Sequence, residues 1–414
     1  MRLRLPFLKP QNIPVIAWVT YDTGNTVFFT GVMGLLFPLW LTKVMGGDDA
    51  TLGFTLAAAM AIVFIISPVL GTVSDQTGNR KSFLVVFTLL FIVSGLLIGI
   101  SSLEVSIACF ALGVVAIHMA DMFYNALLED VSNPNNMGLV AGLGVGLGYL
   151  GAIAAVLISF MWMETLGHLN VIRILSILML ILTLPLMLVG KNKPGEHPTE
   201  KFSIASFAYL FIHRLITAIR TLRTEPTWAR FLVARFWYMW AINAAGSFVV
   251  LYGIETLRLT QQQVHIILLL GIISGVPSGV IWGKLVDTIG PLAILKTGVV
   301  SLFILLCVTA LIPLLNLPSW IWGIVGILSG IAVAGVYVAE RPFVLSIAQP
   351  GRVGEYFGLN SMSGRLSAVA GPFSWGIISV TLGLGQIAAV LWLTGCLCLA
   401  LITLNGIKSK QPGP

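Results

Sequence analysis

Long apolar stretches recur along the whole chain, and this recurrence limits the possible folds more than any other feature of the sequence. A stretch of about 20 apolar residues can cross the hydrocarbon core of a bilayer as a helix. The composition agrees, because 57% of the 414 residues are hydrophobic and only 9% are charged, whereas soluble domains carry about 25% charged residues. The sequence therefore predicts an integral membrane protein that crosses the bilayer many times.

Twelve such stretches can be distinguished. Each is continuously apolar, which is typical of spanning helices and not of outer-membrane strands, where apolar and polar residues alternate. The predicted spans are residues 14–41, 51–74, 82–101, 104–131, 138–162, 170–190, 229–257, 263–286, 291–315, 318–344, 354–382 and 385–405.

Basic residues are distributed unequally between the two sides of the predicted membrane. Of the 23 Lys and Arg residues, only Lys43, Arg173 and Arg258 lie on one side, three more lie within or at the ends of spans, and the rest lie on the other side. The basic side is normally cytoplasmic, so we expect both termini in the cytoplasm. The net charge of +7 then reflects orientation, and no nucleic-acid partner is expected. All four cysteines lie in apolar stretches, so neither a disulfide nor a metal site is indicated.

One long polar segment, residues 191–228, divides the spans six and six. It predicts three parts: an N-terminal bundle (1–190), a cytoplasmic linker (191–228) and a C-terminal bundle (229–414). Within the linker, apolar residues at helical spacing between 207 and 222 predict an amphipathic helix on the inner leaflet, and a solvated connector is the alternative.

The pattern G-x-x-x-D-x-x-G occurs twice, each time at the inner end of the second span of a half. Such an internal repeat implies two similar bundles about an axis normal to the membrane. The predicted fold class is therefore an all-α membrane protein with twelve transmembrane helices in two pseudo-symmetric six-helix bundles. The first copy contains Gly71, Asp75 and Gly78, followed by Arg80 and Lys81, and the second contains Gly283, Asp287 and Gly290.

This repeated loop resembles the signature cytoplasmic loop of the major facilitator superfamily. The resemblance implies a role in gating for these residues, with a purely structural turn as the alternative. In physical terms, Gly71 is expected to let two helices approach, Gly78 to form the tight turn, and Arg80 and Lys81 to anchor the loop at the inner leaflet.

Four segments carry a narrower resemblance: residues 18–29, 123–132 and 354–372, and the glycine run that ends in GYLG. They resemble the autophagy-related vacuolar amino-acid effluxer family and its bacterial relatives. The resemblance implies an amino-acid or peptide effluxer. We further expect a monomer in a bacterial inner membrane. A more distant similarity to cation-coupled sugar symporters rests on acids in the first and fourth helices.

Gly146, Gly148 and Gly151 spell the G-x-G-x-x-G pattern of dinucleotide-binding proteins. They lie within a predicted span, with no preceding strand and no compact βαβ unit, so the dinucleotide interpretation fails. The small residues instead predict close helix packing, and we expect sliding surfaces between the bundles, with ordinary tight packing as the alternative. These ridges are Gly138, Gly142 and Gly146; Gly144, Gly148 and Gly151; and Ser363, Ser367 and Gly371.

Acidic residues within spans mark the candidate site, because a charge at the centre of a span costs about 2.5 to 3.5 kcal/mol even on mild scales. Asp22 lies in the first predicted span and Asp121 in the fourth. We expect this pair to act as a coupling carboxylate and a substrate or cation ligand. Further polar residues at helical spacing complete the candidate site: Asn25, His118, Tyr124 and Asn125.

The coupling ion predicted from this pair is a proton, since removal from water and a nearby like charge both favour the protonated carboxyl group. Na⁺ is an alternative that needs several hard oxygen ligands. His118 is either a proton relay or a packed histidine bonded to a backbone carbonyl. No organic cofactor and no bound metal are expected.

The second half contributes cations within spans, Arg235 and Arg365, with Asn243 nearby in sequence. A positive group opposite the acids suits a zwitterionic or anionic solute. Salt bridges that close the cytoplasmic gate are the alternative, and they are the favoured interpretation for Arg341, which follows Glu340.

The sequence thus predicts a secondary-active transporter that moves a small polar solute by alternating access. An amino-acid-like solute is favoured. The alternatives are a cation-coupled sugar or lipid-related carrier and a non-transporting receptor on the same scaffold. No phosphate-binding loop and no constellation of catalytic residues is found, so an enzyme is not expected. The expected partners are the lipid bilayer and a small-molecule substrate.

Overall fold

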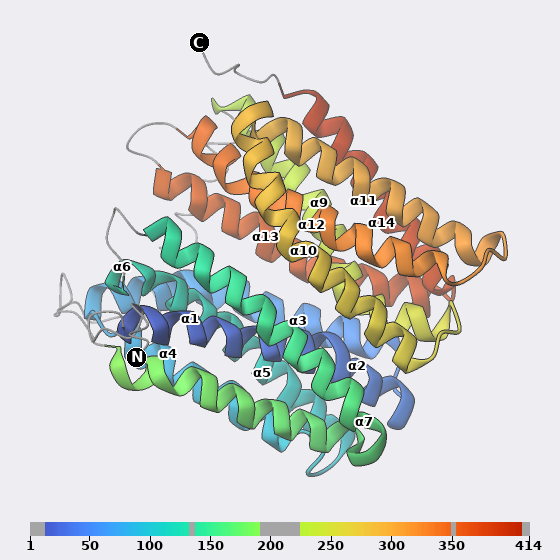
Figure 1. Ribbon diagram of the computed structural model, residues 1–414, viewed down its shortest axis with the longest axis horizontal. Helices are drawn as coiled ribbons and strands as arrows, with labels where there is room; N and C mark the ends of the chain where they lie inside the picture. Colours follow the sequence, from blue (N-terminus) through green and yellow to red (C-terminus); the bar gives the residue numbers. More distant parts are fainter. Residues whose placement is uncertain (1–12, 132–136, 191–223, 349–352, 408–414) are drawn as a thin grey trace, which may run out of the picture. The chain divides into compact units, whose positions relative to one another are not determined.

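The computed structural model describes residues 13–131, 137–190, 224–348 and 353–407 (Figure 1). Within these ranges the regular structure is helical, and no strand occurs. The first helix, α1 (Ile13–Val27), continues through the π-helical segments η3 (Phe28–Leu36) and η4 (Trp40–Val44), which flank α2 (Phe37–Leu39). The other elements are α3 (Asp49–Thr77), α4 (Arg80–Leu97), α5 (Leu103–Ala126), α6 (Leu128–Val131), α7 (Met137–Val189), α9 (Pro226–Glu255), α10 (Gln261–Ile289), α11 (Pro291–Leu314), α12 (Ile321–Ile347), α13 (Val353–Gly376), η5 (Ile377–Thr381) and α14 (Gly385–Asn405).

Ten helices in the described part of the chain are long and apolar enough to cross a membrane. This confirms the prediction of an all-α protein with many membrane passes. The reason is local, because continuous apolarity over the length of a bilayer leaves the helix as the structure that satisfies every backbone polar group. The predicted amphipathic helix between residues 207 and 222 lies outside the described residues.

The helix α7 has 53 residues but is not one straight rod. At 1.5 Å per residue a straight helix of this length would extend about 80 Å, far more than the hydrocarbon core of about 30 Å. Gly167 interrupts it with φ 76° and ψ 162°, and the chain turns back there (Figure 1). The two halves of α7 correspond to the predicted spans 138–162 and 170–190.

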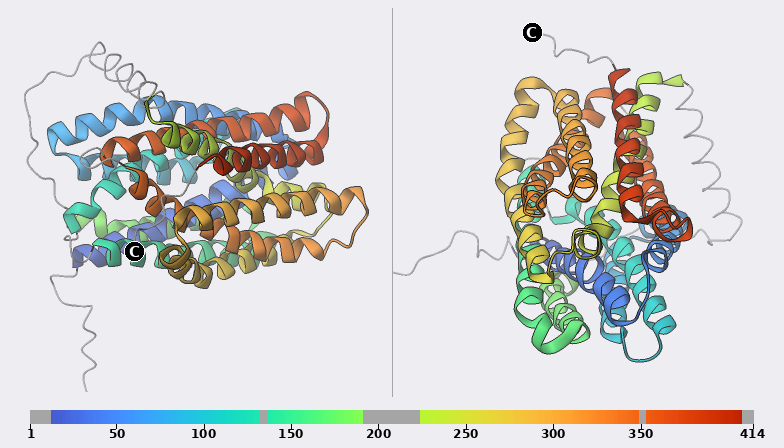
Figure 2. Two further views of the ribbon diagram at one scale, coloured as in Figure 1. Left: turned by 90° about the horizontal axis from the view of Figure 1, so that it is seen from above. Right: turned by 90° about the vertical axis from the view of Figure 1, so that its right-hand side faces the viewer.

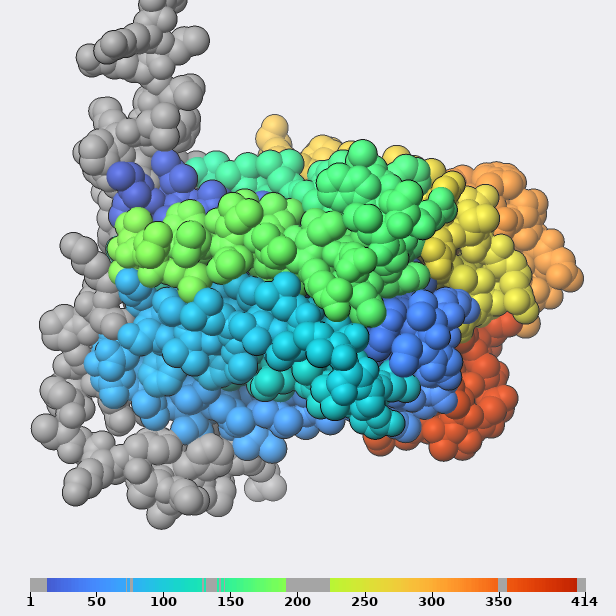
Figure 3. All heavy atoms as spheres, turned by 90° about the horizontal axis from the view of Figure 1, so that it is seen from below, coloured from blue at the N-terminus to red at the C-terminus, as the bar shows by residue number. Residues whose placement is uncertain are grey.

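The chain divides into two compact units, Met1–Trp40 with Ile65–Phe211, and Leu41–Phe64 with Ile212–Pro414. In the first unit α1 packs against α7, and α4 packs against both α5 and α7; the green surface of α7 lies beside the blue surface of α4 in Figure 3. In the second unit α12 packs against α10 and α11, while α9 packs against α13 and α14 (Figure 2).

The helix α3 contributes to both units, since the boundary falls between Phe64 and Ile65. Its first residue is fixed within the second unit. Asp49 Oδ2 accepts hydrogen bonds from Trp375 Nε1 at 2.7 Å and from Gln386 Nε2 at 2.8 Å. The N-terminal end of α3 is therefore held by α13 and α14 through polar contacts as well as by packing.

Each of the repeated loops contains a glycine with a positive φ angle. Gly78, between α3 and α4, has φ +70°, and Gly290, between α10 and α11, has φ +93°. Residues with a Cβ atom rarely adopt such angles, so glycine is the residue that permits the tight turn at both places. The sequence repeat is thus also a repeat of local structure.

Candidate functional site

Glycines in the first half of α7 bring α1 close in the first unit. A Cβ atom on Gly148 would lie 2.9 Å from Asp22 Oδ2, and a Cβ atom on Gly151 would collide with the backbone carbonyl of Thr23. Any larger residue would push the two helices apart. The Asp22 carboxylate therefore lies directly against the backbone of α7.

The prediction that these glycines form a sliding surface between the bundles is wrong for the ridge that contains Gly148, because it packs against α1 of the same unit. Gly146, from the other predicted ridge, has no atom within 4 Å of a Cβ placed on it. The surroundings of Gly138 and Gly142 lie outside what the structure describes.

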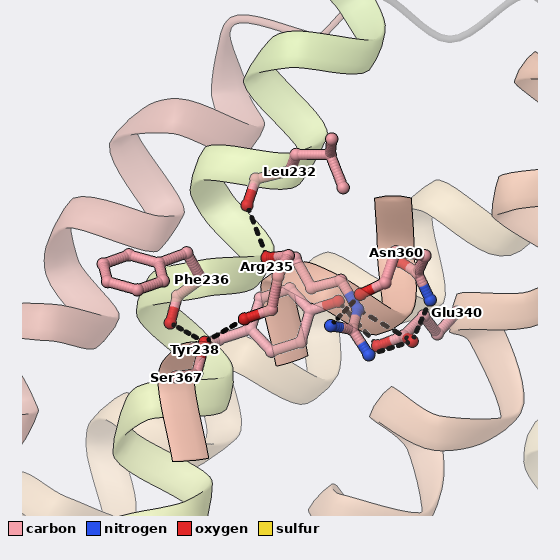
Figure 4. A network of polar contacts seen from close by, with 8 residues as sticks. Leu232, Arg235, Phe236, Tyr238, Glu340, Asn360 and Ser367 are labelled. Atoms are coloured by element: carbon pink, nitrogen blue, oxygen red, sulfur yellow. Dashed lines mark hydrogen bonds and ion pairs between the residues drawn. The ribbon is translucent and has the colours of Figure 1, made fainter. Parts of the chain in front are cut away.

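The small residues of α13 behave in the same way within the second unit. Ser367 Oγ donates to the Phe236 carbonyl at 2.9 Å, and Ser363 Oγ donates to the Leu232 carbonyl at 3.2 Å (Figure 4). A Cβ on Gly371 would lie 2.9 Å from the carbonyl oxygen of Trp240. In each unit a ridge of small residues thus packs against the first helix of that half of the chain.

Asp121 on α5 is engaged by two amide groups. Its Oδ1 accepts from Asn25 Nδ2 at 3.2 Å, and its Oδ2 accepts from Asn125 Nδ2 at 3.1 Å. Asn125 also donates to the Asp121 carbonyl at 2.8 Å. These contacts join α1 to α5 and fix the orientation of the Asp121 carboxylate, so the structure brings three of the predicted site residues together.

Asp22 has the opposite surroundings. Its side chain is half-buried, and among the described residues neither a hydrogen-bond donor nor a cation contacts its carboxylate. Among the described side chains, Thr26 Oγ1 donates to the backbone carbonyl of Asp22 at 2.9 Å, not to its carboxylate. An acid within a spanning helix that has no protein partner is available to a proton or a ligand.

Three aromatic rings lie beside these acids. Trp18 and Tyr124 stack with centroids 4.4 Å apart, and Tyr21 and Tyr124 stack at 5.1 Å. Trp18 Nε1 donates to the Tyr124 carbonyl at 3.0 Å, and the Tyr21 hydroxyl bonds the hydroxyl of Thr88 at 2.7 Å. Gly144 makes room for this stack, since a Cβ there would lie 2.6 Å from the Trp18 ring.

Two buried polar atoms of this cluster have no hydrogen-bond partner in the described structure. They are Asn25 Oδ1 and the Tyr124 hydroxyl oxygen. Asn25 and Tyr124 are 2% and 3% exposed, so bulk water does not reach them freely. Both Asp22 and Asp121 are near enough to act electrostatically on the Tyr124 hydroxyl. Unsatisfied buried polar atoms are uncommon in proteins and need an explanation.

His118 lies one turn before Asp121 on α5. Its half-buried ring meets the ring of Phe29 edge to face, with centroids 5.1 Å apart. The polar stripe expected along α5 is therefore present, with His118 packed against an aromatic side chain of η3.

In the second unit Arg235 and Glu340 form a buried ion pair, each 7% exposed (Figure 4). Arg235 Nη2 lies 2.9 Å from Glu340 Oε1, and Arg235 Nε donates to the same oxygen at 3.0 Å. Asn360 Nδ2 donates to Oε1 at 2.9 Å, and the Tyr238 hydroxyl donates to Oε2 at 2.9 Å. Glu340 thus receives donors from three residues, and Arg235 is neutralised within its own unit.

The backbone completes the fixation of Arg235. Its Nη1 donates to the Asn360 carbonyl at 2.6 Å. A Cβ on Gly364 would lie 2.5 Å from Nη1, so this glycine lets the guanidinium lie flat against α13. Arg235 is therefore a structural cation in this conformation, and the expected positive group opposite the acids is occupied by Glu340.

The other residues predicted in the second half are dispersed. Asn243 on α9 and Arg365 on α13 are half-buried, whereas Arg341 on α12 is exposed although Glu340 beside it is buried. Neighbouring residues of a helix point in directions about 100° apart, which separates these two side chains.

The first repeated loop is tied to the ends of nearby helices. Arg80 Nη1 donates to the Ala126 carbonyl at 3.5 Å, and Lys81 Nζ donates to the Leu188 carbonyl at 3.4 Å. Cations at helix C-termini satisfy free carbonyls and interact favourably with the helix dipole. Both side chains thus join α4 to its neighbours in the first unit.

The expected close approach at Gly71 is wrong, because a Cβ there would come no closer than 4.0 Å, to the sulfur of Met122. A Cβ on Gly283 would have no neighbour within 4 Å. Asp287 is exposed. The side chain of Asp75 lies outside what the structure describes.

The polar cluster around Asp49 was not predicted. Gln386 Nε2 bridges Asp49 and Glu255, to which it donates at 2.8 Å in each case, and Lys43 pairs with Glu255 at 2.7 Å. Asp49 was overlooked because the second predicted span began at residue 51. The run GGDD before that span is the only local signal, and it does not identify a partner more than 300 positions away.

The family model of the Major Facilitator Superfamily matches residues 24–372. An uncharacterised MFS-type transporter of Bacillus subtilis, YxiO, is 24% identical over 399 residues, which cover 91% of this chain and 89% of that protein. Autophagy-related protein 22-1 of Neosartorya fischeri is 22% identical over 270 residues, 58% of this chain and 43% of its own length. The structure of a POT family transporter in complex with 5-aminolevulinic acid has a TM-score of 0.76, with 12% identity over 97% of this chain and 98% of that one.

Proposed function

The chain belongs to the major facilitator superfamily, and we propose that it is a secondary-active transporter that moves a small polar solute by alternating access. The resemblance predicted from the repeated loop and from the four segments is confirmed by the family match and the relatives. A transporter needs a lipid bilayer and a small-molecule substrate as partners, and we propose no enzymatic activity.

We propose the twelve-span, two-bundle architecture on the following count. Ten described helices are candidate spans. The helix α7 turns back at Gly167 and so accounts for two passes, and α13, which is not among the ten, accounts for the twelfth. An even number of passes and the basic loops favour both termini in the cytoplasm of a bacterial cell. The proposed protein is a monomer with bundles at 1–190 and 229–414.

The observation that carries the proposal is the contrast between the carboxylate of Asp22, which has no partner among the described residues, and the amide-bound carboxylate of Asp121. Asp121 is a positioning residue, because Asn25 and Asn125 hold it. Asp22 is the residue that binds the transported ion or solute, because no protein group among those described satisfies it. We propose a proton as the coupling ion, with Na⁺ as the alternative.

An amino-acid-like solute is favoured by the relationship to the autophagy-related proteins. A cation-coupled sugar or lipid-related carrier keeps the same fold with another ligand, and the solved relatives include a D-xylose-proton symporter. A non-transporting receptor on the same scaffold is the remaining candidate, and it would bind without flux.

Transport in proteoliposomes tests the proposal. Purified protein is reconstituted, and counterflow of labelled amino acids and sugars is measured with and without an imposed pH gradient. We expect gradient-driven accumulation of one class, and loss of that accumulation in Asp22→Asn with exchange at equal pH retained. Full accumulation by Asp22→Asn contradicts Asp22 as the coupling group. No flux of any solute by folded protein favours the receptor.

A further inference from the structure

The two halves of the chain place polar residues at matching positions on their first helices. Asp22 and Asn25 lie three residues apart on α1, and Arg235 and Tyr238 lie three residues apart on α9. The separation from Asp22 to Arg235 exceeds that between the repeated turn glycines, Gly78 and Gly290, by only one residue. In each half, an acid lies on the last long helix before the small-residue ridge, Asp121 on α5 and Glu340 on α12.

The matched positions differ in one decisive respect. In the second half, the residue at the first position is a cation, and both Arg235 and Tyr238 donate to Glu340. In the first half the first position is an acid, Asp22, and of the two matched positions it is Asn25 that donates to Asp121. The first half therefore has an acid, Asp22, at the position where the second half has the cation of its buried ion pair.

The unpartnered groups around Asp22 can all act as hydrogen-bond acceptors. The carboxylate of Asp22 receives no donor from the described residues, and Asn25 Oδ1 is buried without a partner. The Tyr124 hydroxyl oxygen is also buried without a partner. It lies against Gly144, one turn of α7 from Gly148, which faces the Asp22 carboxylate. Asp22 and Asn25 lie on one face of α1, one turn apart. Such a group of acceptors calls for a ligand rich in donors.

We propose that Asp22, Asn25 and Tyr124 form the binding seat for a protonated primary amine of the transported solute, an inference that rests on the proposed transport function. An ammonium group has three N–H donors and no acceptor, so its donors match the three acceptors. Its charge would neutralise the Asp22 carboxylate, as the Arg235 guanidinium neutralises Glu340 in the second half. The stacked rings of Trp18 and Tyr124 add a face that attracts cations.

Other ligands satisfy this seat less well. A proton on Asp22 supplies a single donor and leaves the Asn25 and Tyr124 oxygens unsatisfied. A neutral alcohol also supplies one donor and no charge. A quaternary ammonium ion supplies charge but no N–H donor. The number of donors and the charge together identify the amine.

Thermal unfolding of the purified full-length protein in detergent tests the inference, because a ligand that binds only the folded state raises Tm. The probes are n-butylammonium, tetramethylammonium, Na⁺ and n-butanol, at equal concentration, constant ionic strength and neutral pH. We expect n-butylammonium to raise Tm in a saturable way, and the other three probes to raise it much less. An equal shift with tetramethylammonium or Na⁺ overturns the amine assignment.

Substitutions test which residues form the binding seat. Asp22→Asn should weaken n-butylammonium binding roughly 100-fold, because it removes the charge partner. Tyr124→Phe retains the ring stack and removes only the hydroxyl group, so it should weaken binding about tenfold. Glu104→Gln makes the same acid-to-amide change at an exposed position of α5 and should leave the shift unchanged. An unchanged affinity in Tyr124→Phe overturns the three-acceptor seat even where Asp22→Asn does not fold.

Failure of this inference can be distinguished from failure of the proposed function. If counterflow shows Asp22-dependent transport of a solute that has no amine, the transport function stands and the amine seat is wrong. If n-butylammonium raises Tm through Asp22 while no solute moves in proteoliposomes, the amine seat stands and the transport function fails.

Discussion

Asp22 and Glu340 are both acids on spanning helices, yet their surroundings are opposite. Glu340 is buried with the guanidinium of Arg235 and further donors from Tyr238 and Asn360. Asp22 is half-buried and has no donor among the described residues. A satisfied buried charge stabilises one arrangement of helices, whereas an unsatisfied one is retained at a cost in free energy. The comparison indicates a structural role for the acid of the second half, and it is the reason why we propose a ligand-binding role for Asp22.

The strongest test of this difference is to remove Arg235, the cation that pairs with Glu340. Arg235→Met leaves Glu340 buried without its counter-charge, and we expect a loss of about 3 to 5 kcal/mol in the free energy of unfolding. The double variant Arg235→Met/Glu340→Met should recover most of this loss, because no unpaired charge remains. Chemical unfolding in detergent measures both. Equal destabilisation of the single and double variants would show that packing, and not charge, dominates at this pair.

The helix contact that positions Asp22 gives the next effect. Gly151→Ala places a methyl group against the backbone of Thr23, and we expect a loss of about 1 to 3 kcal/mol from overpacking. Gly146→Ala is the matched control on the same helix, because its Cβ would have no neighbour within 4 Å, and it should be neutral. Thermal unfolding compares the two. A destabilised Gly146→Ala would contradict the assignment of the ridge.

Substitutions of Asp22 and Asp121 should differ in their effect on the stability of the protein as well as on transport. Asp121→Asn removes an acceptor from the amides of Asn25 and Asn125, and we expect a loss of about 1 to 2 kcal/mol. Asp22→Asn removes a charge that has no described partner, so stability should be unchanged or higher. Tm values of the two isosteric variants, measured side by side, decide the matter. Destabilisation by Asp22→Asn alone would reverse the proposed roles.

The smallest expected effect concerns the support of Tyr124. Tyr21→Phe keeps the stacked ring and removes the hydrogen bond to Thr88, for which we expect a loss of about 0.5 to 1.5 kcal/mol. Transport should persist, because Tyr21 contributes no free acceptor to the seat. Unfolding and counterflow assays on the same preparation provide the measurement, and loss of flux without loss of stability would give Tyr21 a direct role.

Several features of the fold could be predicted from the sequence because their causes are local. A continuously apolar segment must form a helix in a bilayer whatever its neighbours are. The repeated turns at Gly78 and Gly290 need glycine for their positive φ angles. Asp22 and Asp121 could be chosen as candidate site residues from the sequence alone. An acid within a span is costly in free energy, and this can be recognised without knowing its neighbours.

Tertiary structure alone decided which side chains meet. The sequence did not indicate that Gly148 faces Asp22, that Arg235 pairs with Glu340, or that Gly71 has no close neighbour. Which helix faces pack together depends on contacts between residues far apart in the chain. The positions of charged residues in the sequence indicate that burying them is costly, but they do not identify the group that pairs with each charge. The sequence thus determined the helices, the turns and the existence of costly acids. Packing determined that Glu340 is satisfied within the protein while Asp22 is not.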